Sequence, residues 1–441
     1  MNPRDRSRPR IAFFDAADVF EDFYPHYGVD QSAFTTTWAS SSGNHAFVDL
    51  LQREVGDVTW YQISLDPTLD RARHLVLGCE VRFLRSPPLH RVLWKAFYLP
   101  RNAWRWRSAY RPFATVASYA ALASPRHIAR IRRDNPDVLF VQDYASGRFD
   151  MLLAIARLLR IPLIARHSGS TPDRYLGGLA RRWTLPRADL IIASGQDELE
   201  MLVTRFDVPR HRVVVVLTPI DVTTFQPVDR TLACAAFELD PSRRYVVFVG
   251  RFDPVKRLEA IIREFAALAP KHADADLLLA GSGREQENLR RISAGLPPGR
   301  VRLLGWVSEP QRKAQLYGLA ECLVLASQRE GFPTVVGEAM ACGTPVLSSR
   351  VGGVPELVTE GETGWMFAPG DDDGLREKLD WVLEHADTVR AIRPHVRGIA
   401  LDRVSPTAVA AALRACFVAA GVRNVSGNLA DQGAAAAGTE A

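Results

Sequence analysis

The chain has 441 residues, 47% of them hydrophobic, and a formal net charge of +5. This composition is typical of a globular protein, and the length is sufficient for two domains of roughly 200 residues. Its longest apolar runs are much shorter than the roughly 20 residues of a membrane-spanning helix, and its basic N-terminus lacks the apolar core of a signal peptide. The five cysteines are too scattered for a disulfide framework or a CxxC metal site, so we expect reduced thiols and a cytoplasmic protein.

Short apolar runs alternate with helical patterns along the chain, as is typical of parallel βαβ units. In the first half, the strand candidates are 11–16, 58–63, 138–143, 162–167, 190–194 and 212–217. In the second half, they are 245–250, 276–281, 301–306, 322–327 and 344–349. Because these runs are apolar on both faces, helices should cover both sides of each sheet. The predicted fold class is therefore α/β, with two doubly wound, Rossmann-like domains facing a cleft and functional loops at the carboxyl ends of the strands.

The regular pattern is interrupted at 217–231, where prolines and small polar residues gather. We therefore expect a first domain over 1–218 and a second domain over 219–400. A C-terminal helix over 401–421 could pack back on the first domain. The last stretch, 422–441, is rich in alanine and glycine and has no periodicity, so it is predicted to be a disordered tail.

The stretch 81–133 contains twelve lysines and arginines, no acidic residue, and nine aromatic residues that include Trp94, Trp104 and Trp106. In the plainest interpretation, it forms helices whose apolar faces cover the sheet and whose arginines are solvated. In the alternative, its aromatic side chains enter a lipid headgroup region while its basic side chains meet anionic lipid. Single-stranded nucleic acid suits the same residue types, but no nucleic-acid-binding motif accompanies them. We favour an anionic membrane surface and expect no nucleic acid partner.

A histidine, His167, ends the strand candidate 162–167 and is followed by Ser-Gly-Ser-Thr. A core histidine with satisfied hydrogen bonds would be the plain explanation. Because the functional loops of doubly wound sheets lie at the carboxyl ends of their strands, the position of His167 favours a functional role.

Basic and glycine-rich turns follow two strands of the second half. Arg251 and Lys256 flank a turn that precedes the amphipathic helical pattern 257–268. Two cations at the carboxyl end of a strand suit a diphosphate, whereas solvated basic residues at a helix start would oppose the helix dipole. Gly281 and Gly283 would allow close approach of a ligand to the backbone, although a tight turn alone would also explain them.

The stretch "REGFPTVVGEAMACGTPVL" places two carboxylates around a break in regular structure. Glu330 lies on the loop after the strand candidate 322–327, and Pro333 suits the first turn of the helix that follows. Glu338 lies about one turn into that helix, which is predicted to end at Gly343.

Three interpretations of these carboxylates are open: the two acids of a glycoside hydrolase, two solvated surface residues, or two ligands of a sugar nucleotide. The free backbone N–H groups from Phe332 to Val335 and the helix dipole form a ready anion site. A phosphate suits that site better than a neutral glycosidic bond does. We therefore favour a nucleotide diphosphate at the helix start, with one carboxylate for sugar hydroxyls and the other for a ribose.

Four motifs in this order carry a resemblance to a known family: "VVFVGRFDPVKRLE", "LLLAGSG", "VRLLGWVSEPQ" and "EGFPTVVGEAMACGTPVLSSRVGGVPELV". The sequence resembles the retaining glycosyltransferases of family 4, the group 1 glycosyltransferases, which have the two-domain GT-B fold. The resemblance implies a nucleotide-sugar donor and a metal-independent reaction without a cofactor.

The resemblance also implies roles for individual residues. Arg251 and Lys256 would bind the diphosphate, Glu330 would hold hydroxyls of the donor sugar, and Glu338 would bind the ribose. His167 is implied near the reacting sugar. The other residues of the implied donor site are Gly43, Gly281, Gly305, Trp306, Gly331, Phe332, Pro333 and Thr334.

The first domain departs from the family pattern. Gly43 is the best match to a phosphate-facing glycine, but a long insertion precedes it, and Gln142-Asp143-Tyr144 stands where many members place histidine. We expect a UDP- or GDP-sugar donor and a hydroxyl acceptor on a lipid-linked or cell-surface glycan intermediate of polysaccharide biosynthesis. Such a protein could lie peripherally on the inner face of the cytoplasmic membrane. The alternatives are transfer to a soluble small acceptor, epimerisation of a sugar nucleotide, and a non-catalytic GT-B subunit that binds a partner.

Overall fold

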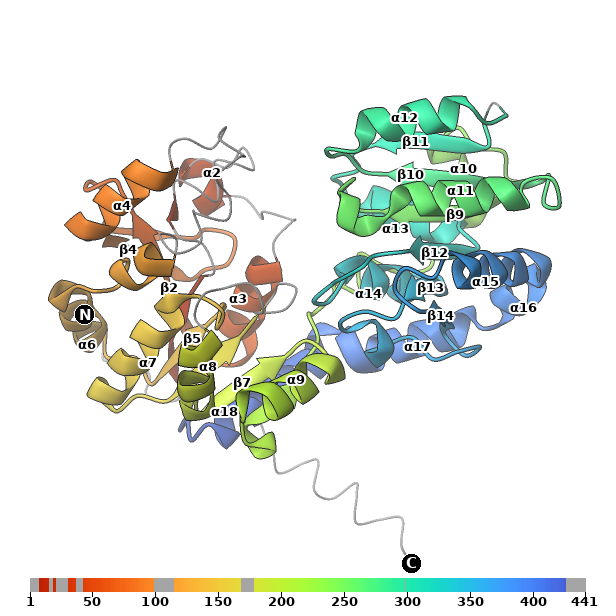
Figure 1. Cartoon of the computed structure of the whole chain (residues 1–441). Coiled ribbons are helices and arrows are strands. Elements are labelled where there is room, and N and C mark those ends of the chain that lie inside the picture. The colour runs from red at the N-terminus through yellow and green to blue at the C-terminus, as the bar shows by residue number, and fades with distance from the viewer. Residues whose placement is uncertain are drawn as a thin grey trace, which may run out of the picture. The chain divides into compact units, whose positions relative to one another are not determined.

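The computed structural model describes residues 8–15, 19–20, 31–36, 43–98, 115–167, 178–297 and 299–425. The chain forms two compact units, and each is assembled from segments of more than one colour in Figure 1, because unit 1 includes most of the blue C-terminal helix. Unit 1 consists of Met1–Ala193, Leu199–Val216 and Ala410–Ala441, and unit 2 consists of Ser194–Glu198 and Leu217–Val409.

Unit 1 is built on a sheet whose described strands follow the order β3-β4-β2-β1-β5-β6-β7-β8. All neighbouring strands are parallel except β3, which pairs antiparallel with β4 at one edge. The strands are β1 (Arg10–Phe14), β2 (Asp57–Ser64), β3 (Arg71–Arg73), β4 (Glu80–Arg85), β5 (Val138–Val141), β6 (Leu163–Arg166), β7 (Leu190–Ala193) and β8 (Val213–Val215).

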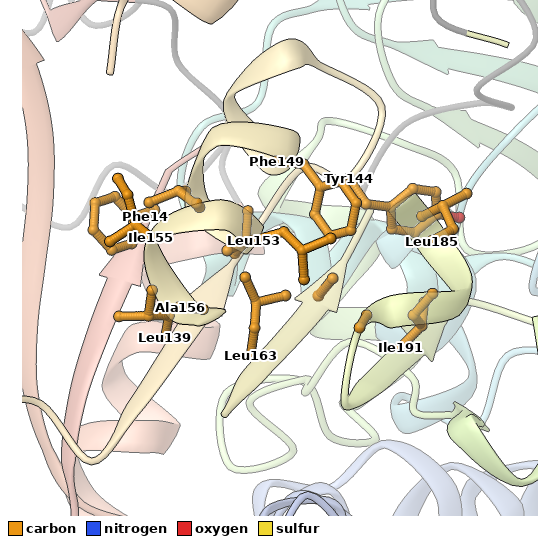
Figure 2. Packing of buried hydrophobic residues seen from close by; sticks show 14 of the residues in the cluster. Phe14, Leu139, Tyr144, Phe149, Leu153, Ile155, Ala156, Leu163, Leu185 and Ile191 are labelled. Carbon is orange, nitrogen blue, oxygen red and sulfur yellow. The ribbon is translucent and has the colours of Figure 1, made fainter. Parts of the chain in front are cut away.

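Helices cover this sheet and bury a large apolar core. Figure 2 shows side chains of α7 such as Leu153 and Ala156 beside Leu139 of β5 and Leu163 of β6. The helices are α2 (Gln31–Thr36), α3 (Gly43–Glu54), α4 (Pro88–Tyr98), α6 (Pro125–Asp134), α7 (Gly147–Leu159) and α8 (Gly178–Thr184), with short 3-10 helices η4 (Leu185–Arg187) and η5 (Arg210–Arg212). Two further helices have residues in both units, α9 (Gln196–Phe206) and α18 (Pro406–Ala419).

Unit 2 is built on a fully parallel sheet whose described strands follow the order β11-β10-β9-β12-β13-β14. Its strands are β9 (Arg244–Val249), β10 (Ala275–Ala280), β11 (Val301–Gly305), β12 (Cys322–Leu325), β13 (Val346–Ser349) and β14 (Gly364–Phe367). Its helices are α10 (Arg230–Ala236), α11 (Leu258–Leu268), α12 (Gln286–Ala294), α13 (Pro310–Leu319), α14 (Thr334–Ala341), α15 (Asp372–Glu384), α16 (Ala386–Ala391) and α17 (Arg393–Val404), with 3-10 helices η6 (Pro254–Lys256) and η7 (Val354–Glu356).

The predicted strands are confirmed, each within two residues at either end, as is the amphipathic helix α11, which buries Leu258, Ile261 and Phe265. Three strands were missed: β3, β4 and β14. None of the described helices combines the length and apolar character that crossing a bilayer requires. The five cysteines are buried and free.

The plainest interpretation of 81–133, helices that cover the sheet, does not describe the whole stretch, because its first residues form β4. In this strand the buried Val81 and Phe83 alternate with Glu80 and Arg82, which are only partly buried, as is typical of a half-buried strand. Trp94 of α4 is partly buried against the core of unit 1.

Other predictions concern residues beyond the described ranges. Trp104 and Trp106 lie there, and so do the Ser-Gly-Ser-Thr stretch after His167 and residues 426–441 of the predicted tail. Pro333 stands one position earlier than predicted, as the residue that precedes α14, with an extended backbone.

Candidate active site

Two predicted residues of unit 2, Lys256 and Glu330, form an ion pair. Lys256 ends η6, which follows β9, and Glu330 lies on the loop that follows β12. Both side chains are largely buried, with 17% and 13% of their surface exposed. Because β9 and β12 are adjacent and parallel, the loops at their carboxyl ends meet at one edge of the sheet. The sheet therefore places a cation and a carboxylate in contact at the edge where such folds bind ligands.

The backbone around Glu330 is held by close packing against a pair of glycines. A Cβ on Gly352 would lie 2.1 Å from the carbonyl oxygen of Gly331, and the φ of Gly352 is +53°, a conformation that favours glycine. The N–H of Gly353 donates to that same oxygen over 2.7 Å. The N–H of Gln328 donates to the carbonyl of Val255, which ties this loop to η6.

The start of α14 offers unused hydrogen-bond donors. The N–H groups of Gly331, Phe332, Thr334 and Val335 have no acceptor within the described part of the chain. Two of them belong to the first turn of a helix, where the macrodipole also favours an anion. Together with Lys256, they form a site that could bind a phosphate.

Glu338 lies inside α14 and is buried, with 7% of its surface exposed. Its carboxylate accepts hydrogen bonds from Lys313 Nζ at 2.9 and 3.0 Å and from the Tyr317 hydroxyl at 2.8 Å. Burial and the neighbouring Glu338 raise the pKa of Tyr317 well above its usual value, so the phenol stays protonated as a donor. A carboxylate has about four acceptor positions, so three contacts leave room on Oε1 for one further donor such as a hydroxyl.

Arg251 and Gly281 lie at the carboxyl ends of β9 and β10. The Arg251 side chain is 65% exposed and lies 3.5 Å from Asp253, so it is accessible to a ligand. A Cβ on Gly281 would lie 1.9 Å from the carbonyl oxygen of Gly250. The glycine is therefore required by packing between two turns of the protein, whether or not a ligand also approaches it.

Gly305 and Trp306 follow at the end of β11. The N–H of Gly281 donates to the carbonyl of Gly305 over 2.7 Å, which joins this strand end to the previous one. Trp306 is 54% exposed and lines a hollow of about 320 Å³ together with Phe237 and Arg312. The ring is thus available for stacking at the same edge of the sheet.

In unit 1, His167 directly follows β6 and pairs with Asp143, which follows β5. His167 Nδ1 lies 3.1 Å from Asp143 Oδ1, and the ring of Tyr144 lies 5.2 Å from the imidazole ring. Burial alone would raise the pKa of Asp143, but the hydrogen bond and charge of His167 and the charge of Arg148 outweigh it and hold the pKa well below its usual range. Asp143 therefore stays ionised and orients the histidine.

Gly43 begins α3 in the same unit, next to a buried polar cluster. Its neighbour Asn44 donates to Asp15, the residue after β1, and Gln62 of β2 donates to the other oxygen of Asp15 over 3.0 Å. The start of α3 is thereby anchored at the carboxyl end of β1, where Gly43 was predicted to face a ligand.

Several residues of these sites were not predicted. Asp15 directly follows β1 and Asp143 lies two residues after β5, and a position at the carboxyl end of a buried parallel strand was a usable signal. Lys313 and Tyr317 lie four residues apart on α13, but nothing in the local pattern distinguishes them from ordinary helix residues. Their role becomes visible only through the contact with Glu338.

Comparison with known families gives two matches. The family model "Glycosyl transferases group 1" matches residues 230–398, and the model "Glycosyltransferase Family 4" matches residues 69–224. The two ranges together cover most of the chain: 230–398 lies within unit 2, and 69–224 lies mainly in unit 1 and extends into the beginning of unit 2.

Among curated proteins, the chain is similar to D-inositol 3-phosphate glycosyltransferase of Mycolicibacterium vanbaalenii, with 32% identity over 252 residues, or 54% of each chain. It is also similar to N-acetyl-alpha-D-glucosaminyl L-malate synthase of Bacillus anthracis, with 29% identity over 43% of this chain and 49% of that protein. The chain thus matches about half the length of these curated relatives.

Among solved structures, HepE of Anabaena in complex with UDP superposes with a TM-score of 0.67 at 16% identity, over 93% of this chain and 99% of that one. Sucrose-phosphate synthase of Thermosynechococcus elongatus gives a TM-score of 0.67 at 21% identity, over 93% and 98%. At these identities the similarity shows the fold, which is GT-B.

Proposed function

Because the chain belongs to the group 1 glycosyltransferases of family 4, we propose that it transfers a hexosyl group from a nucleotide-diphosphate donor to a hydroxyl acceptor. The observation that carries the proposal is the site of unit 2. There Lys256 contacts Glu330 beside backbone N–H groups that have no acceptor within the described residues.

In this proposal, Lys256 changes its ion-pair partner from Glu330 to a donor phosphate when the donor binds. In the free protein its ammonium neutralises Glu330. A bound diphosphate would compete for that ammonium and would also accept from the N–H groups at the start of α14. Glu330 would then be free to accept hydrogen bonds from hydroxyls of the donor sugar, with Gly331 and Phe332 beside it.

The proposed reaction replaces one bond at the anomeric carbon by another with retention of configuration. The bond to the departing diphosphate breaks, and the acceptor oxygen bonds to the same face of the sugar. The hydroxyl proton passes to the leaving phosphate. Arg251, Lys256 and the helix start would stabilise charge on the diphosphate, a contribution that is usually large in such reactions. Since these cations are supplied by the chain, we expect the activity to survive chelation of divalent metals.

The remaining roles are proposed from position and chemistry. Glu338 has room for one ribose hydroxyl, and Trp306 is available for the base. His167, oriented by Asp143, is proposed to lie near the reacting sugar.

A nucleotide sugar with UDP or GDP as carrier is proposed as the donor. Support comes from HepE of Anabaena, whose structures contain UDP and UDP-glucose, and from the curated relatives, whose names describe glycosyl transfer. A lipid-linked or cell-surface glycan intermediate is proposed as the acceptor.

Contact of unit 1 with an anionic membrane is also proposed, and α4 is the element that supports it. Leu89 and Val92 lie almost one turn apart on this helix and are 60% and 63% exposed. This exposed apolar pair belongs to a helix that also carries Arg91 and Lys95, the combination of apolar and basic residues found in interfacial helices. Flotation with anionic vesicles tests this: we expect the protein to float at low salt and Leu89→Asp to reduce flotation. Failure of the unaltered protein to float would contradict the contact.

The deciding experiment is incubation of the purified protein with labelled UDP- and GDP-sugars and a bacterial membrane extract, with and without EDTA. Label in lipid-extractable product would support transfer to a lipid-linked acceptor and would identify the carrier. Label only in soluble product would support a soluble acceptor instead. Conversion of the sugar nucleotide without an acceptor would indicate an epimerase. Absence of any turnover together with unimpaired UDP binding would favour a non-catalytic subunit.

A further inference from the structure

An arginine-lined groove lies in unit 1, between the end of β4, the start of α4 and the start of α6. It encloses about 690 Å³, which is within the range of roughly 300–1,000 Å³ that is usual for small-molecule sites. Six arginines but only one acidic residue, Asp70, line it; the arginines are Arg82, Arg85, Arg91, Arg126, Arg130 and Arg133.

Only two of these arginines have acidic partners in the described part of the chain. Arg82 lies 3.0 Å from Glu80, Arg130 lies 3.2 Å from Asp70, and both also pair with Asp134, at 3.6 and 3.5 Å. The other four, Arg85, Arg91, Arg126 and Arg133, have no acidic partner within the described ranges. The groove therefore holds a concentration of positive charge that the described chain does not neutralise.

Two helix N-termini add to that charge. Both α4 and α6 start with a proline at the groove, and neither has an acidic residue in its first turn. Acidic residues are favoured there because they interact with the positive end of the helix dipole. Here Arg91 and Arg126 stand in or near those first turns instead. Two dipoles and four arginines thus point to an anionic ligand.

A buried histidine joins the elements of the groove. His127 of α6 is 4% exposed and lines the groove, and its Nε2 lies 2.9 Å from the carbonyl oxygen of Arg85. Its Nδ1 is buried and has no hydrogen-bond partner in the part of the chain that the structure describes. The contact between His127 and Arg85 holds the end of β4 against the start of α6. Two regular elements in direct contact therefore form this side of the groove.

We infer that this groove is a second anion site, which binds the phosphate group of a phosphate ester. Guanidinium groups bind phosphate oxygens in a bidentate manner, and the positive ends of two helix dipoles also favour an anion. The phosphate could belong to a soluble phosphorylated molecule or to the headgroup of an anionic lipid. The site lies entirely in unit 1, so the inference does not depend on the proposed transferase activity.

The test compares variants of two arginines that line the groove, Arg91 of α4 and Arg126 of α6, with a variant of Arg132 of α6 as the control. Arg126 lines the groove, whereas Arg132, which is also exposed on α6, does not line it. The full-length protein is titrated calorimetrically with glycerol 1-phosphate while UDP is present to occupy the proposed donor site. We expect Arg126→Gln and Arg91→Gln each to raise the Kd about tenfold, as expected for loss of a charge-assisted contact. Arg132→Gln should change it less than about twofold, because an exposed charge outside the site is screened. Thermal unfolding of each variant verifies that it is folded.

Cosedimentation with vesicles of phosphatidylglycerol and phosphatidylcholine distinguishes the two sources of phosphate. Binding of glycerol 1-phosphate that depends on Arg126 would identify a soluble phosphate ester. Vesicle binding that depends on Arg126, without binding of glycerol 1-phosphate, would identify a lipid headgroup. The inference is overturned if neither probe binds, or if Arg132→Gln weakens binding as much as Arg126→Gln does.

Discussion

Lys256 is the residue on which the proposed chemistry depends most. Its ammonium is the one that contacts Glu330 at the carboxyl edge of the sheet of unit 2. Lys256→Ala should lower kcat by about 10²–10³, because a fixed charge near the departing diphosphate is lost. Turnover at saturating donor is the measurement, and Lys378→Ala, which removes a lysine paired with Glu360 at the surface, is the control. Near-normal turnover in Lys256→Ala would refute the assignment.

Glu338 has a structural role and a proposed binding role, which two substitutions separate. Glu338→Ala should destabilise unit 2 by about 3 kcal/mol, because Lys313 is left without its partner in a largely buried position. Glu338→Gln keeps the shape, so it should mainly weaken UDP binding, by about tenfold, since a charge-assisted hydrogen bond becomes a neutral one. Calorimetric titration with UDP measures this. Unchanged affinity in Glu338→Gln would leave Glu338 with the structural role alone.

Two buried histidines, His45 and His74, should make unit 1 sensitive to acid. Their rings lie 5.5 Å apart. Burial, with the nearby His74, lowers the pKa of His45 to about 3, and burial lowers the pKa of His74 to about 4. Between these values and the ordinary 6.5, only the unfolded chain binds the protons. Stability is therefore full above pH 6.5 and is lost as the pH falls toward 4.

The expected loss can be measured by urea unfolding near pH 7.5 and pH 5.5. At the lower pH each histidine should reduce the free energy of unfolding by about 1.4 kcal/mol. His74→Leu should remove about half of the combined loss, since one of the two titrating groups is gone. An equal loss in the unaltered protein and the variant would show that these histidines do not control the acid response.

At the scale of single elements, the turns after the strands of unit 2 depend on particular glycines. Gly281→Ala should destabilise the protein by about 2–4 kcal/mol, because its Cβ would overlap the carbonyl oxygen of Gly250. Gly398→Ala is the control, since Gly398 lies in α17 with open space around it and alanine suits a helix better by about 0.5–1 kcal/mol. Thermal unfolding should move in opposite directions for the two variants, and two similar shifts would contradict the packing argument.

Some elements were predictable from their residues and others were not. Strands β5, β7 and β12 are buried at every position, and their short apolar runs indicated them clearly. Strand β4 mixes arginines with apolar residues, and β3 has three residues at the sheet edge, so neither presents an apolar run. These two strands therefore lack the apolar signal by which the other strands of unit 1 were recognised.

At the scale of the whole molecule, the part of α18 from Ala410 onward belongs to unit 1. Phe417 is fully buried and stacks on Phe140 of β5 with a centroid distance of 6.2 Å. Phe417→Ala should therefore destabilise unit 1 by about 3–5 kcal/mol. The adjacent Val418 is 47% exposed, so Val418→Ala should cost less than about 1 kcal/mol. Urea unfolding compares the two, and equal effects would show that α18 does not contribute to this core.

The fold class and the family followed from local patterns, because apolar strands and glycine-rich turns can be recognised from neighbouring residues alone. The same patterns suggested the residues of the proposed donor site. Which residues meet depended on the folded chain. Lys256 and Glu330 are 74 positions apart, and Asp143 and His167 are 24 apart. They come together because strand order in a sheet differs from chain order. The stacking of Phe417 on Phe140 likewise depends on the folded chain, because these residues become neighbours only after distant segments have packed.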